Sequence, residues 1–166
     1  NNPIWTRFGI TAAPALMFLD KNGSETDWIF GFVPPIKGLF IKIKESLQGI
    51  DTVRSLEDRI AAVPDDVEAL CKLGAKQLNR RLTMSMSRDL FNQVLKLDPE
   101  GKQGTFSPDW VAGKVTYAEY AVYALAYLAT LKPTQDPRPM VAFLVKYPKS
   151  ALGELAQKAL IPFLKR

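Results

Sequence analysis

The sequence contains no histidine, and this absence removes several kinds of catalytic site. Its 166 residues also include a single cysteine, Cys71. Without histidine, the chain by itself carries no Ser-His-Asp or Cys-His triad and no histidine acid, base or metal ligand. One cysteine excludes an internal disulfide, a CxxC redox pair and a cysteine zinc site within these residues. We therefore expect no metal and no cofactor, and with neither a catalytic dithiol nor a histidine in the chain, whether the protein is an enzyme stays open.

Long hydrophobic runs are absent as well. The longest candidate, from Tyr120 to Leu131, is interrupted by tyrosines and is shorter than the ~18 apolar residues of a membrane-spanning helix. It predicts a buried helix, and we expect no transmembrane segment. The chain opens with Asn1 rather than Met, so we expect it to follow a processing site, a cleavage or a cloning boundary.

The composition is that of a folded protein, with 47% hydrophobic and 23% charged residues. The net charge of +5 is concentrated in the last third, where residues 105–166 carry eight Lys and Arg against four Asp and Glu. These basic residues are dispersed rather than clustered, which disfavours nucleic-acid binding. A mildly basic solvated surface explains them; binding to a membrane surface is a weaker alternative.

The first fifty residues have the pattern of a β-hairpin followed by a helix. Two apolar runs, 15–19 and 26–33, flank a turn at Asn22-Gly23. Their continuous apolar character predicts a sheet covered on both faces. Pro34-Pro35 then begins an amphipathic helix that packs on the sheet and stops at Gly49.

Residues 51–166 show only helical patterns, so we predict an α+β chain whose second part is all α. We expect Asp51 to cap the first of these helices and Asp65 or Asp66 to cap the second. A third covers about 85–97, and 99–114 forms a long irregular connection. Further helices are expected from the capping box at Thr116, from Asp136-Pro137 and from Ser150.

The segment from Phe8 to Gly23, followed by Gly31-Phe32 and the helix at 34–48, resembles the C-terminal half of a thioredoxin-like domain. The ordered elements are a glycine and an aliphatic residue, a proline before an apolar strand, an aspartate and a glycine, a second strand ending in glycine and an aromatic residue, and a helix. We assign residues 1–49 to this partial domain. The resemblance implies that the active-site dithiol and a central strand lie upstream of Asn1.

The proline that matches in this family is Pro14, which follows Ala13. The resemblance implies a cis peptide bond there and a substrate-binding role for Ala13 and Pro14, because exposed backbone groups can pair with an extended peptide. The alternative is that Pro14 only begins a strand. The full-length protein would then be a thiol-disulfide oxidoreductase or a thiol-handling chaperone. Family analogy points to the bacterial periplasm or cell envelope.

Residues 64–99 resemble one tetratricopeptide (TPR) repeat. Leu73-Gly74 and Leu97-Asp98-Pro99 match its pattern, and Ser87 supplies the small residue of the second helix, although Gln77 replaces the usual aromatic. We assign 51–166 to a TPR-like helical region. The alternative function is a non-catalytic protein–protein interaction module. We expect a protein or peptide partner, and the missing N-terminal half or another chain could complete the fold.

Two further groups of residues are candidate sites. An aromatic stripe could bind a partner in a groove, or it could form a packed seam between helices. Its members are Tyr117, Tyr120, Tyr123 and Tyr127. The acidic residues Asp65, Asp66 and Glu68 match no calcium-loop spacing, and helix capping explains them. Cys71 is expected to be a small buried hydrophobic residue rather than a reactive thiol.

Overall fold

The computed structural model is mixed in secondary structure and mostly helical, with two small antiparallel hairpins. It describes residues 3–8, 10, 14–31, 36–80, 83–108, 111–131 and 133–164. The chain forms two compact units, Asn1–Ser87 and Arg88–Arg166. The α+β class expected from the sequence is confirmed at this level. None of the described helices is long and apolar enough to cross a membrane.

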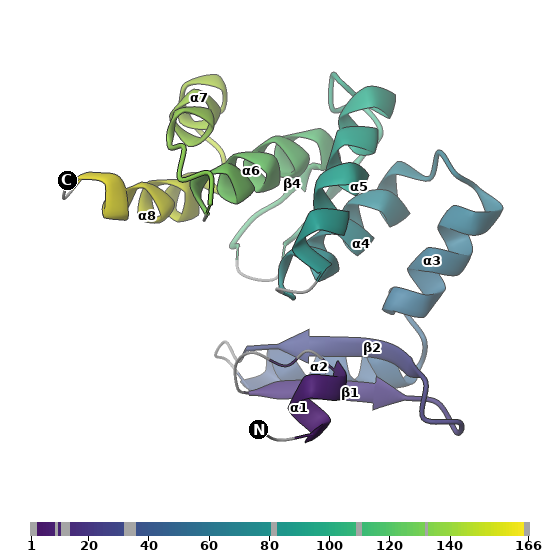
Figure 1. Cartoon of the computed structure of the whole chain (residues 1–166). Coiled ribbons are helices and arrows are strands. Elements are labelled where there is room, and N and C mark those ends of the chain that lie inside the picture. Colours follow the sequence, from purple (N-terminus) through teal and green to yellow (C-terminus); the bar gives the residue numbers. More distant parts are fainter. Residues whose placement is uncertain are drawn as a thin grey trace. The chain divides into compact units, whose positions relative to one another are not determined.

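Unit 1 combines a β-hairpin with four helices (Figure 1). Its elements are α1 (Pro3–Phe8), β1 (Ala15–Leu19), β2 (Glu25–Phe30), α2 (Ile36–Leu47), α3 (Val53–Ala62) and α4 (Val67–Leu78). The helix α1 is an addition to the sequence prediction, because six residues are too few to show a helical period.

The predicted hairpin is confirmed. Its strands are antiparallel, and Ala15 lies opposite Phe30. The turn is held by the Asp20 carboxylate, which accepts the backbone N–H groups of Asn22 at 2.8 Å and Ser24 at 3.0 Å. Gly23 has a φ of 74°, a conformation that glycine adopts without steric cost. The Asn-Gly pair therefore marks the turn for the expected reason.

The helix caps decide where α3 and α4 begin. The expectation that Asp51 caps α3 is wrong: the Thr52 hydroxyl accepts the N–H of Ser55 at 3.1 Å. Asp51 instead has a φ of 47° and pairs with Lys72. Asp66 caps α4 by accepting the N–H of Ala69 at 2.9 Å, so one of the two predicted caps is confirmed.

Unit 2 is a helical unit in which α6 packs against both α7 and α8 (Figure 1). Its elements are β3 (Thr105–Phe106), β4 (Val115–Thr116), α6 (Tyr117–Thr130), α7 (Arg138–Lys146) and α8 (Gly153–Leu164); α5 (Met84–Leu97) crosses from one unit to the other. The capping box is confirmed at its first half, since the Thr116 hydroxyl accepts the N–H of Glu119 at 3.0 Å.

The connection at 99–114 is more ordered than predicted. Thr105 and Phe106 pair with Thr116 and Val115 as a two-residue antiparallel ladder, so the expectation of helices alone after residue 51 is wrong. Two residues per strand are too few to show an alternating pattern. Gly104 permits the close approach of this connection to α6, because a Cβ there would lie 2.9 Å from the Tyr117 ring.

Candidate functional site

The backbone around Pro14 is partly committed to the hairpin. Pro14 is exposed, and its carbonyl accepts the N–H of Gly31 at 2.9 Å. Proline has no N–H to donate. Any backbone pairing with a substrate at this point would therefore have to use Ala13. Ala13 and its peptide bond to Pro14 lie outside the described residues, so the cis bond and the substrate-binding role stay predictions.

Beyond Pro14, the strand β1 has a free edge among the described residues, because the sheet contains only β1 and β2. Hydrogen-bonded and non-bonded pairs alternate along an antiparallel ladder. The bond between Pro14 and Gly31 therefore places the N–H and C=O groups of Ala15 and Met17 on the side away from β2. Such an edge is a template for another strand.

The helix α2 also leaves large apolar side chains exposed. This helix packs against β2, but none of its side chains is buried. Phe40 is 62% exposed and Leu47 is 73% exposed, while Leu19 of β1 is 45% exposed. The predicted covering of the sheet on both faces is therefore not met within the described residues. Uncovered apolar side chains on this scale mark a surface that another element buries.

A buried carboxylate joins the hairpin to the helices of unit 1. Asp27 on β2 is fully buried and accepts three kinds of donor: the Lys76 ammonium at 2.8 and 3.0 Å, the Ser46 hydroxyl at 2.7 Å and the Val53 N–H at 3.3 Å. A buried charge with these partners is compensated. Asp27 thus connects β2 to α4, to α2 and to the start of α3.

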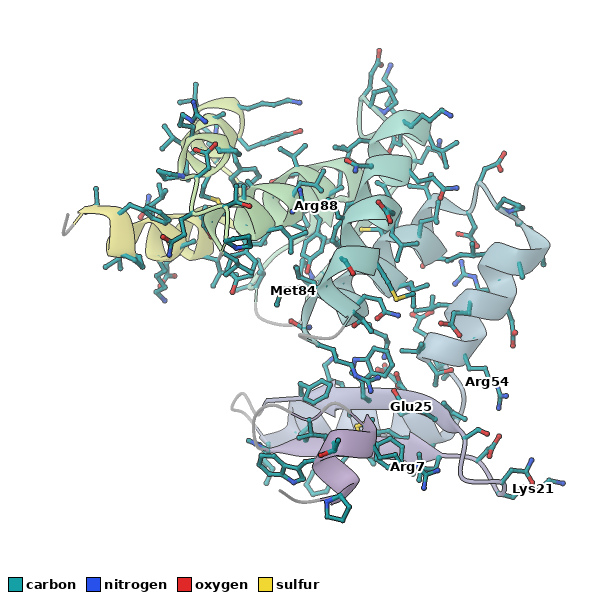
Figure 2. All side chains as sticks on the ribbon, viewed as in Figure 1. Arg7, Lys21, Glu25, Arg54, Met84 and Arg88 are labelled. Atoms are coloured by element: carbon teal, nitrogen blue, oxygen red, sulfur yellow. The ribbon has the colours of Figure 1, made fainter. Side chains whose placement is uncertain are left out.

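A second ion pair lies beside the first. Arg80 pairs with Glu25, donates to the Phe8 carbonyl, and places its guanidinium 4.6 Å from the centre of the Trp28 ring. Figure 2 labels Glu25 on β2. The sequence analysis missed this cluster. The sequence does contain one indication of this cluster. Glu25 and Asp27 lie within or next to an aromatic strand, and a charged residue buried there needs a partner of opposite charge.

Cys71 has the structural character that its sequence context predicts. The side chain is fully buried in α4. This burial raises the pKa of the Cys71 thiol well above its ordinary value, and nearby Lys72 only partly opposes the shift. The nucleophilic form of cysteine is the thiolate. In this environment the thiol is therefore unreactive at neutral pH.

The tyrosine stripe lies mainly inside unit 2. Tyr117, Tyr120 and Tyr123 are buried, and Tyr127 is partly buried. Tyr123 contacts the Phe143 ring edge-on, with 5.6 Å between centroids. Burial, and then the neighbouring Tyr127, raise the pKa of Tyr123 to about 12. These contacts favour the packed seam over the open groove, and the partner-binding role of the stripe stays a prediction.

Two acidic residues at the start of α4 cap the helix or form ion pairs with nearby basic residues. Asp66 caps the helix and pairs with Arg59 at 2.8 Å, and Glu68 pairs with Lys72 at 2.6 Å. Partial burial acts to raise the pKa of Asp66, but the Ala69 N–H and Arg59 outweigh it and hold the pKa below its ordinary value. Among the described residues, no cluster of acidic and cysteine side chains has the arrangement of a metal site.

A hollow of about 310 Å³ opens in unit 2. Its lining includes Lys114, Glu119, Tyr147, Lys149 and Ser150, from the connection before β4, the first turn of α6 and the turn between α7 and α8. No local sequence pattern reveals it, because its lining residues are separated by up to 37 positions and share no motif. We call this feature the unit 2 hollow.

Comparison with known proteins gives no assignment. No protein-family model, no curated protein and no solved structure matches this chain. The thioredoxin-like and TPR-like resemblances therefore rest on the sequence motifs alone and stay predictions.

Proposed function

We propose that residues 1–49 are the C-terminal part of a thioredoxin-like domain, and that the full-length protein is a thiol-disulfide oxidoreductase or a thiol-handling chaperone. Two observations carry this proposal: β1 has a free edge among the described residues, and apolar side chains of α2 are uncovered. The resemblance places a central strand and the active-site helix upstream of Asn1. A strand from that half would satisfy the free backbone groups of Ala15 and Met17, and its helix would lie against the apolar surface.

The chemistry of this proposal lies outside the chain. Cys71 is fully buried and is not available as the attacking thiol. The dithiol upstream would exchange with a substrate disulfide. One thiolate attacks a substrate sulfur, which breaks the substrate S–S bond, releases its other sulfur as a thiolate and leaves a mixed disulfide. The second thiolate then attacks the protein sulfur of the mixed disulfide, which forms the protein's own disulfide and releases the dithiol substrate. Ala13 and Pro14 would hold the extended substrate beside this reaction.

Alkylation of the full-length protein with iodoacetamide, followed by mass spectrometry, tests the proposal. We expect two thiols that react in the reduced native protein, that lie upstream of Asn1 and that form a disulfide on oxidation. Cys71 should react only after unfolding. An upstream segment without a cysteine pair would overturn the redox function.

The second candidate is a non-catalytic interaction module built on TPR-like helices. The observation that favours it is the unit 2 hollow, which is lined by residues of both charges and an aromatic ring. The site needs no group from outside unit 2. A screen of peptide ligands against the chain tests this role, and the absence of any saturable binding would count against it.

A further inference from the structure

We infer that the unit 2 hollow binds an acidic peptide segment. The inference deepens the proposed interaction role, and it does not depend on an upstream dithiol. A volume of about 310 Å³ lies at the lower end of ligand pockets, and it suits one or two peptide side chains rather than a folded surface.

The charge of the hollow supports an anionic ligand. Lys114 and Lys149 line it, and Lys146 lies 5.1 Å from the centre of the neighbouring Tyr147 ring. Elsewhere in the described part of unit 2, Lys102 and Lys158 are paired with glutamates. None of the described carboxylates forms an ion pair with the three lysines around the hollow. Their ammonium groups are therefore available to a ligand carboxylate.

The hydroxyl groups of Ser150 and Tyr147, which also line the hollow, are further hydrogen-bond donors for an anionic ligand. Ser150 already accepts the N–H of Leu152 at 3.0 Å, so its hydroxyl proton can be donated outward. Tyr147 also lines the hollow, and its ring is held against Phe143 with 5.3 Å between centroids. A ligand can thus rest its apolar atoms on a fixed ring while its anionic oxygens meet Lys and Ser donors.

Glu119 distinguishes a peptide from a nucleic acid. Its carboxylate also lines the hollow and can only accept hydrogen bonds when ionised. A peptide backbone supplies N–H donors to such a group. A phosphodiester backbone offers Glu119 no donor, whereas a peptide can turn its backbone N–H groups to Glu119 and its acidic side chains to the lysines. The combination of two lysines and one glutamate therefore favours an acidic peptide.

The walls of the hollow are closely fitted before a ligand arrives. A Cβ at Gly113 would lie only 3.0 Å from the Ala151 Cβ, and Gly113 has a φ of 144°. The backbone before Lys114 thus lies directly against the turn that carries Lys149 and Ser150. This contact fixes the separation of the two lysine-bearing segments, and such preorganisation lowers the entropic cost of binding.

Fluorescence anisotropy with a labelled eight-residue peptide tests the inference. The probe carries two central glutamates, and a matched peptide carries two glutamines. We expect the glutamate peptide to bind at least fivefold more tightly at low salt. The Lys114→Ala, Lys149→Ala double variant should weaken its binding about five- to tenfold, since it removes two exposed ion pairs that each contribute modestly.

Lys96→Ala is the matched control. Lys96 is exposed in the last turn of α5 and does not line the hollow, so this variant should change affinity less than twofold. Circular dichroism verifies that each variant is folded. Equal binding of the two peptides, or an unchanged affinity in the double variant, would overturn the inference. Tighter binding of an octathymidylate than of the acidic peptide would also overturn it and assign the surface to nucleic acid.

The outcome separates the two proposals for this protein. Failure of peptide binding would remove the interaction site in unit 2 and would leave the upstream dithiol untouched. Conversely, an upstream segment without cysteines would end the redox function and would not affect binding measured on these 166 residues.

Discussion

At the scale of single residues, Asp27 is the most consequential side chain in unit 1. It is fully buried and accepts hydrogen bonds from Lys76, Ser46 and Val53. One carboxylate therefore stabilises the contact of β2 with three helical segments. A sequence reading assigns Asp27 to a strand, but it cannot identify Lys76 as the partner, because 49 positions separate the two residues and no local pattern links them.

Asp27→Asn should destabilise unit 1 by about 2–3 kcal/mol, because it leaves the Lys76 ammonium without its partner in a largely buried site. Urea unfolding followed by circular dichroism measures this change. Asp65→Asn is the control: Asp65 is exposed, so its substitution should cost less than about 0.5 kcal/mol. Addition of Lys76→Met to Asp27→Asn should recover about 1 kcal/mol. If Asp27→Asn and Asp65→Asn changed the free energy of unfolding equally, the buried pair of Asp27 and Lys76 would contribute nothing to stability.

Asp66 gives the fold a predictable dependence on pH. Its pKa in the folded state is lowered, so the folded protein holds the charged carboxylate more strongly than the unfolded chain does. The resulting stabilisation is present above the unfolded pKa of ~3.9 and is lost as the pH falls through the lower folded pKa. Asp66→Asn retains an N-cap acceptor and removes the charge pair with Arg59.

We expect Asp66→Asn to cost about 0.5–1 kcal/mol at pH 7 and progressively less as the pH falls below ~3.9 toward the lowered folded pKa. Unfolding measured across this range provides the test, with Asp65→Asn again as the control. A difference between wild type and Asp66→Asn that stays constant down to pH 2 would contradict this account of the carboxylate.

At the scale of elements, the sequence predicted those whose apolar spacing or turn chemistry is local. The hairpin, its Asn-Gly turn and the helices at 36–47 and 67–78 follow directly from such patterns. The two-residue strands β3 and β4 and the short helix α1 could not be predicted, because they are shorter than the period that would reveal them. The choice of Thr52 over Asp51 as a cap depends on backbone angles that the sequence does not specify.

We expect the exposed apolar side chains of α2 to be buried only in a longer chain. Phe40→Glu should change the stability of the 166-residue chain by less than about 0.5 kcal/mol, because Phe40 is largely exposed there. In a longer chain that includes the upstream half, the same substitution should cost about 2 kcal/mol or more, since it buries an unpaired charge.

Thermal or urea unfolding of both chains measures this contrast. Lys37→Glu is the matched control on the same helix: it is exposed and introduces the same residue, so its effect should be small in both chains. A small effect of Phe40→Glu in the longer chain would show that the upstream segment does not cover α2.

At the scale of the whole molecule, each unit has a buried core and some exposed apolar side chains. Unit 2 encloses Phe91, Phe143 and the tyrosine seam but leaves Val145 and Leu164 exposed, and unit 1 leaves large side chains of α2 and β1 exposed. That the first segment is only part of a domain stays a prediction from its resemblance. It could not locate the unit 2 hollow, because that site forms only when three distant segments meet.

Amide hydrogen exchange at β1 tests the central claim most directly, by comparison of the 166-residue chain with a chain that includes the upstream half. The Leu16 amide faces β2 in the ladder and should be protected in both chains. The Ala15 and Met17 amides should exchange rapidly in the shorter chain and become strongly protected in the longer one, where an upstream strand bonds to them. Rapid exchange of Ala15 and Met17 in the longer chain would contradict the proposal that β1 is an interior strand of a thioredoxin-like sheet.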